Sequence, residues 1–154
     1  MDIKEKIHSL SEDLLKNIER LVVINSQLGT PAEGMPFGPG PAKALDEALS
    51  IARELGFKTV NLDHYCGYAE MGEGDDIVGI AGHLDIVPAG GDWTYDPFAL
   101  TRKGDYVYGR GTTDDKGPVL EALYAMKLLR DSGIRLNKRV RPVSYTHLTL
   151  PTIA

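Results

Sequence analysis

The sequence IVGIAGHLD (residues 77–85) places an uninterrupted apolar run directly before an imidazole and a carboxylate. A short apolar run bounded by polar residues is typical of a strand inside a sheet. Side chains two positions apart on a strand point to the same side, so His83 and Asp85 are expected to lie together. We therefore predict a buried strand over 76–85 that carries both side chains to its carboxyl end.

A second stretch, GRGTTDDKG (residues 109–117), leads two adjacent carboxylates, Asp114 and Asp115, through a glycine-rich turn. The helix predicted over 115–131 follows directly and ends at Gly133. Open α/β sheets bind their ligands beyond the carboxyl ends of the strands. Together the two stretches offer His and Asp side chains to a divalent metal ion at such an edge.

The remaining elements alternate between helices and strands. Apolar residues recur at helical spacing over 2–24, although Ser9 and Glu12 resemble a capping box that favours a break. A loop over 25–40, rich in glycine and proline, precedes a second helix that starts near Pro41 and ends at Gly56. Further strands are predicted over 57–62, 65–71, 99–102, 106–108 and from 136 to 140. This order predicts an α/β fold with a mixed sheet flanked by helices and covered on both faces.

Composition restricts the environment and the partners. The 154 residues carry a net charge of −5, and no basic stripe is present, which argues against nucleic-acid and anionic-membrane partners. Cys66 is the single cysteine, so no disulfide forms within the chain, as suits a reducing cytoplasm. No apolar run has the length of a membrane span, and the first residues do not resemble a signal peptide. We expect a soluble cytoplasmic protein of one domain.

The last thirteen residues, 142–154, differ from the rest of the chain. They contain no Asp, Glu, Lys or Arg, whereas the segment before them is rich in basic residues. The string VSYTHLTLPT (143–152) resembles one translated frame of a transposon-type sequencing adapter. We therefore expect residues 1–141 to form a partial catalytic domain and 142–154 to be a non-native tail. A natural polar tail is the alternative.

Each candidate ligand also has an ordinary structural explanation. A single histidine on a strand is usually a hydrogen-bonded residue, and an aspartate before a helix is usually an N-cap. The occurrence of both clusters in order, each following a strand, favours a metal site. In that site His83 suits a terminal ligand, Asp114 a carboxylate that bridges two ions, and Asp85 the group that orients the imidazole.

Other motifs are weaker. A phosphate loop at 111–116 is disfavoured because two carboxylates stand where an anion would bind. His64 and Cys66 lack further ligands, so a turn histidine and a packed cysteine explain them better. Trp93 and Phe98 either line a substrate pocket or anchor the proline-rich loop around them.

The stretches GHLDIVP (82–88) and GRGTTDDKGP (109–118) resemble the co-catalytic metallopeptidase family of aminoacylases, glutamate carboxypeptidases and dipeptidases. The resemblance covers residues 10–141 and includes MPFG (35–38), LGFKT (55–59) and Trp93 with DPF (96–98). The form DDKGP (114–118) is most similar to the PepV-type bacterial dipeptidases, which include carnosine-cleaving enzymes. The chain is thus expected to be the amino-terminal part of a metallopeptidase catalytic domain.

The resemblance implies that His83 binds one metal ion, that Asp114 bridges two, and that Asp85 orients His83. It also implies a Glu-Glu pair, containing the general base and a further ligand, another Asp and a distant His. None of these has a match here, because the sequence departs from the family pattern at Pro142. The expected activity of the parent protein is metal-dependent dipeptide hydrolysis, and the chain by itself is expected to be inactive.

Two alternatives remain open, namely deacylation of N-acyl amino acids within the same family and a non-catalytic binding fragment. Zinc is the first choice among the two divalent metal ions, and the same donors suit manganese or cobalt. The substrate side chains and the oligomeric state are not indicated. The resemblance further predicts a cis Asp114–Asp115 peptide. The metal assignment requires ligand atoms of His83 and Asp114 within roughly 6 Å of each other.

Overall fold

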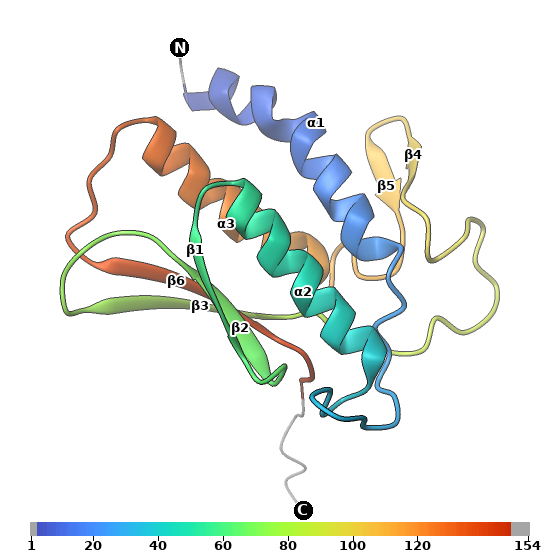
Figure 1. The fold of residues 1–154 in the computed structure, drawn as a ribbon. Coiled ribbons are helices and arrows are strands. Elements are labelled where there is room, and N and C mark those ends of the chain that lie inside the picture. Colours follow the sequence, from blue (N-terminus) through green and yellow to red (C-terminus); the bar gives the residue numbers. More distant parts are fainter. Residues whose placement is uncertain (1–2, 149–154) are drawn as a thin grey trace, which may run out of the picture.

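The computed structural model describes residues 3–148, which form three helices and six strands (Figure 1). In chain order the elements are α1 (Ile3–Val22), α2 (Pro39–Glu54), β1 (Lys58–Leu62), β2 (Cys66–Glu70), β3 (Ile77–His83), β4 (Thr101–Lys103), β5 (Tyr106–Tyr108), α3 (Lys116–Asp131) and β6 (Arg139–Tyr145). The expected elements are all present, and the α/β class is confirmed. Among residues 3–148, no helix combines the length and apolar character that a membrane span requires.

Four strands form one mixed sheet in the order β1-β2-β6-β3. β1 and β2 are an antiparallel hairpin, β6 is antiparallel to β2, and β3 is parallel to β6. β4 and β5 form a separate antiparallel hairpin beside the end of α1 (Figure 1). The predicted mixed sheet is therefore confirmed, and its parallel pair β3 and β6 is the part that leads to the candidate site.

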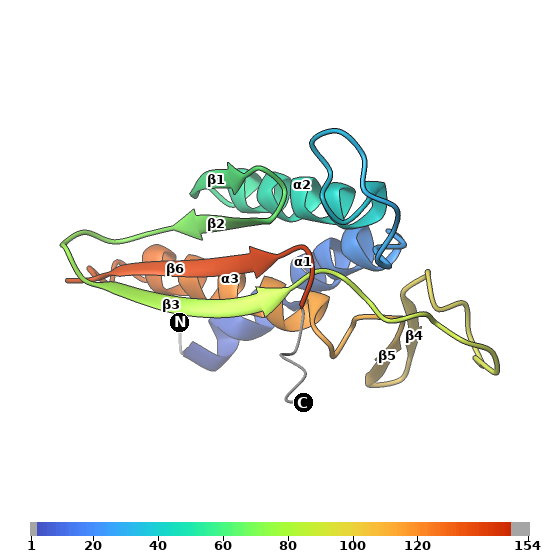
Figure 2. The same cartoon turned by 90° about the horizontal axis from the view of Figure 1, so that it is seen from below.

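The helices lie on one face of this sheet. Gly67, Ser144 and Gly82 are cross-strand neighbours, so they face the same side. A Cβ at Gly67 would meet side chains of α2, and a Cβ at Gly82 would meet Val119 of α3. Figure 2 shows β6 and β3 in front of α3 and α1. The prediction of a sheet covered on both faces is thus wrong for the described residues.

The prediction of a buried strand over 76–85 is also wrong for most of its length. Residues 77–81 are exposed, with Ile77 at 44% and Val78 at 46%. The reason is position, because β3 is an edge strand with a neighbour only in β6. Burial begins directly after the strand, at Leu84 and Asp85.

The core fills the space between the helices and the covered face of the sheet. Its buried members include Leu21 of α1, Leu45 and Ile51 of α2, and Leu120 and Met126 of α3. α1 is a single helix, so the predicted break near Ser9 does not occur. The Ser9 hydroxyl instead donates to the carbonyl of Lys6 within the helix.

The expected non-native tail begins within β6. The strand continues through Tyr145, and Ser144 and Thr146 are buried. Residues 149–154 of the tail lie outside the described residues. The non-native origin of 142–154 stays a prediction.

Candidate metal centre

The first side chains of the candidate site follow from the end of β3. His83 is the last residue of the strand, and Asp85 comes two positions later in the buried segment. The Nδ1 atom of His83 lies 3.1 Å from Oδ1 of Asp85 and 3.1 Å from the Asp85 backbone oxygen. Both atoms accept hydrogen bonds, so they favour a proton on Nδ1 and leave Nε2 to face the opposite direction.

Asp114 approaches His83 from the turn between β5 and α3. Its Oδ1 atom lies 3.1 Å from Nε2 of His83, although 31 positions separate the two residues. The expected convergence of these ligand atoms is therefore present. The His83 side chain is 16% exposed and that of Asp114 is 85% exposed, so the pair opens to solvent on the carboxylate side.

The peptide bond between Asp114 and Asp115 is cis, as the resemblance predicted. The side chain of Asp115 points to β3, where its Oδ2 accepts the backbone N–H of His83 at 3.1 Å. Gly82 makes room for this contact, because a Cβ there would lie 2.8 Å from Oδ2 of Asp115. Sequence reasoning assigned no role to Asp115, although the adjacent pair of aspartates was a signal for one.

Lys116 is a further residue that sequence reasoning missed. Its side chain is fully buried, and Nζ donates to the carbonyls of Leu21 and Ile24 at 2.8 and 2.7 Å. Burial lowers the pKa of Lys116 to about 8. The contact joins the turn that carries Asp114 to the carboxyl end of α1, where the last carbonyls of a helix need donors.

The electrostatics of His83 reflect opposing influences. Burial of the imidazole lowers its pKa, whereas the charge of Asp85 and the hydrogen bond to Asp114 raise it. The net effect is a raised pKa for His83, because both ring nitrogens face oxygen acceptors. A metal ion binds the unprotonated Nε2, so a raised pKa makes metal binding compete with protonation of the ring.

Asp85 has a second neighbour in His147, whose Nδ1 lies 2.9 Å from Oδ2 of Asp85. The backbone N–H of Leu148 also donates to this carboxylate. Both residues belong to the segment 142–154, which composition sets apart from the chain. The expected role of Asp85 therefore rests on its contact with His83.

Within residues 3–148, no group of three or more His, Cys, Asp and Glu side chains is arranged to hold a metal ion. The site consists of His83 and Asp114 as candidate ligands, with Asp85 behind the imidazole. His64 and Cys66 do not form a second site. His64 occupies a turn instead, where its Nε2 lies 2.9 Å from Oδ1 of Asp46.

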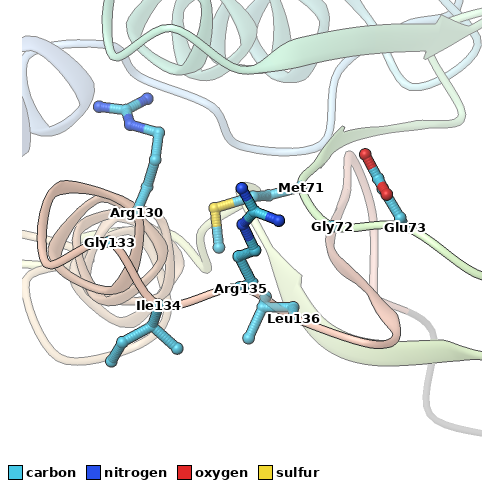
Figure 3. A pocket seen from close by; sticks show the side chains of 8 residues that line it. All are labelled: Met71, Gly72, Glu73, Arg130, Gly133, Ile134, Arg135 and Leu136. Atoms are coloured by element: carbon cyan, nitrogen blue, oxygen red, sulfur yellow. The ribbon is translucent and has the colours of Figure 1, made fainter.

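A cavity of about 610 Å³ lies elsewhere, between the segments that precede β3 and β6 (Figure 3). Met71, Glu73, Arg130 and Arg135 are among the residues that line it. It lies toward the amino ends of the two parallel strands, whereas His83 marks the carboxyl end of β3. This cavity is therefore separate from the candidate metal centre.

Comparison with known proteins links this geometry to one family. Residues 79–145 match the sequence profile described as peptidase family M20/M25/M40. The chain is 42% identical over 134 residues to "Putative dipeptidase YtjP" of Bacillus subtilis. This match covers 86% of the chain and 29% of that protein. It is 39% identical over 142 residues to a Staphylococcus aureus protein that is also described as a "Putative dipeptidase", and this match covers 91% of the chain and 30% of that protein. The chain thus spans about 30% of the length of these curated relatives.

Solved structures share the fold. Human carnosine dipeptidase 1 has a TM-score of 0.79 at 24% identity, covering 94% of this chain and 34% of that one. An M20 family metallo-carboxypeptidase from Sulfolobus solfataricus has a TM-score of 0.71 at 26% identity, covering 86% of this chain and 30% of that one. The likeness at 24% identity concerns the fold alone.

Proposed function

This chain belongs to the peptidase family M20/M25/M40, and we propose that the whole protein to which it contributes is a metal-dependent dipeptidase. The observation that carries the proposal is the approach of His83 Nε2 to Asp114 Oδ1, 3.1 Å apart, beside the carboxyl end of β3. Imidazole and carboxylate are the donors that a hydrolytic divalent metal requires. The relatives described as dipeptidases support the peptide substrate.

The donor set of the chain fits a metal ion at this position. His83 would provide Nε2, and Asp114 has two carboxylate oxygens with which to bridge a pair of ions. Asp85 keeps the proton of His83 on Nδ1, so that the lone pair of Nε2 is available. When bound, two divalent ions would polarise the scissile carbonyl and lower the pKa of an attacking water.

Zinc is our first choice for both ions, and manganese or cobalt suit the same donors. The general base and the remaining ligands have no match among the residues of this chain. In the proposed whole protein, residues outside this chain would provide them. By itself, the chain is then inactive. His83 and Asp114 act within it as ligands, and Asp85 as a positioning residue.

The test uses the whole protein with its metal restored after chelation. We expect metal-dependent hydrolysis of β-alanyl and Xaa-His dipeptides, with His83→Ala reducing the activity and weakening metal binding. His64→Ala is the matched control, since His64 contacts Asp46 and lies outside the site. Preferential hydrolysis of N-acetyl or N-succinyl amino acids would instead establish the deacylase alternative. Metal-independent hydrolysis would overturn the proposal.

A further inference from the structure

Trp93 borders two neighbouring cavities at the outer side of the candidate metal centre. The first cavity, of about 330 Å³, is lined by Trp93, Tyr108, Arg110 and Asp114 among others. We call it the Trp93 cavity. The second, of about 370 Å³, shares Trp93 and Tyr108 and adds Tyr95. The Trp93 cavity therefore extends from an aromatic wall to Asp114, the candidate ligand that contacts His83.

The orientation of the Trp93 ring is fixed by two contacts. Its indole N–H donates to the backbone oxygen of Ala89 at 2.8 Å. The guanidinium of Arg110 lies 4.9 Å from the ring centroid, and its Nη2 donates to the same Ala89 oxygen at 3.1 Å. One carbonyl thus connects both side chains, and the ring forms a wall before any ligand arrives. A preformed wall lowers the entropic cost of binding.

Anchoring of the loop does not account for all of these features. A tryptophan that served only as an anchor would be expected to bury its ring, yet Trp93 is 36% exposed. Phe98, the other aromatic residue of this loop that the sequence singled out, lines neither cavity. The two residues therefore differ, and of the two only Trp93 lines the cavity that Asp114 also borders.

We propose that the Trp93 cavity binds one side chain of the dipeptide substrate and favours aromatic over small side chains. The inference rests on the proposed function, because it places the scissile bond at Asp114. A flat side chain would stack on the Trp93 ring, with Tyr108 as the neighbouring aromatic wall. Trp93 is thus a specificity-determining residue, whereas His83 and Asp114 serve the reaction for every substrate.

The kinetic test compares dipeptides that differ only in one side chain, such as Ala-Ala, Ala-Phe and Phe-Ala, on the metal-loaded whole protein. We expect Trp93→Ala to lower kcat/KM for at least one aromatic dipeptide about tenfold more than for Ala-Ala, chiefly through KM. Trp93→Phe should keep most of the preference. Tyr106→Ala is the aromatic control, because Tyr106 is 70% exposed on β5 and borders neither cavity.

A second readout does not depend on turnover. Trp93 is the only tryptophan of the 154-residue chain, so the fluorescence of this chain reports on the cavity directly. We expect the emission to change with Ala-Phe or Phe-Ala and to change less with Ala-Ala. An absent or equal response contradicts the proposal, and this measurement remains decisive if Trp93→Ala fails to fold.

The outcomes separate the two proposals. If the unsubstituted whole protein hydrolyses no dipeptide, the proposed function is wrong. If it hydrolyses dipeptides and Trp93→Ala affects all of them equally, or none, the function stands and the subsite is wrong. A selective loss for aromatic substrates, with Tyr106→Ala unchanged, supports both.

Discussion

The carboxylate of Asp115 accepts the backbone N–H of His83, with 3.1 Å between Oδ2 and the nitrogen. This bond fastens the amino end of α3 to the last residue of β3. Asp114, the residue before Asp115, is thereby held beside the His83 ring, so that two candidate ligands distant in sequence share one anchor. The anchor is a positioning device, because Asp115 contacts the backbone of His83 and not its ring.

Substitution of Asp115 should therefore change metal affinity indirectly. In the whole protein, we expect Asp115→Ala to weaken divalent-metal binding by about 10–100-fold, as is typical for groups that orient a ligand. Asp115→Asn retains an oxygen acceptor, so its affinity for the metal should be closer to that of the unsubstituted protein. Metal titration against a competing chelator measures both. If Asp115→Ala binds the metal as tightly as the unsubstituted whole protein, Asp115 does not position the ligands.

The turn before α3 is also tightly packed around its glycines. A Cβ at Gly117 would lie 2.0 Å from the backbone oxygen of Thr112, which cannot move without displacing the turn. We expect Gly117→Ala to lower the free energy of unfolding by about 1–3 kcal/mol or more. Gly79→Ala is the control, since a Cβ on this exposed strand position meets nothing within 4 Å. Urea denaturation of both variants checks the difference, and similar values for the two would contradict it.

A polar contact between α1 and α3, away from the candidate metal centre, leads to a prediction about stability. The Tyr124 hydroxyl donates to Asp13 at 2.6 Å and accepts a hydrogen bond from the buried Asn17 side chain at 2.6 Å. Tyr124→Phe should lower the free energy of unfolding by about 1–3 kcal/mol, because it leaves the Asn17 donor unsatisfied. Tyr106→Phe, on an exposed ring, should change stability by less than about 0.5 kcal/mol. Denaturation curves near neutral pH test both.

The same contact has a defined pH dependence. Burial and the hydrogen bond to Asp13 raise the pKa of Tyr124. The unfolded chain releases this proton near pH 10, whereas the folded chain retains it to higher pH. Above pH 10 the folded state therefore binds more protons than the unfolded state. The stabilisation that Tyr124 contributes is then lost as the pH rises. The difference in stability between the unsubstituted chain and Tyr124→Phe should become smaller above pH 10. A constant difference would contradict the raised pKa of Tyr124.

Local patterns predicted the elements and the convergence of His83 with Asp114, because both clusters follow strands and contain unusual polar residues. The exposure of β3 was not predictable in the same way. Hydrophobic periodicity reports what a strand could bury, whereas burial depends on which elements lie against it. In the described residues, β3 is an edge strand, so residues 77–81 remain exposed.

Lys116 escaped sequence analysis for a different reason. Its partners are the backbone carbonyls of Leu21 and Ile24, more than ninety positions away. Any residue type provides such a carbonyl, so no pattern of side chains marks the contact. Trp93 was ambiguous from the sequence, because pocket lining and loop anchoring both suit a tryptophan between prolines. Its contacts with Ala89 and Arg110 anchor the loop, and its remaining exposure is the observation that supports our proposal of a substrate pocket.

The last prediction concerns the chain taken alone. Two candidate ligands, His83 and Asp114, leave most coordination positions to water, and residues 3–148 hold no group of three potential ligands. Divalent-metal binding should therefore be weak. A missing general base removes about 10²–10⁴-fold of rate, and missing ligands remove more. We expect the purified 154-residue chain to hydrolyse no dipeptide above a metal-only blank, whereas the whole protein does. Metal-dependent turnover by the chain, abolished by His83→Ala, would show that its own residues suffice for catalysis.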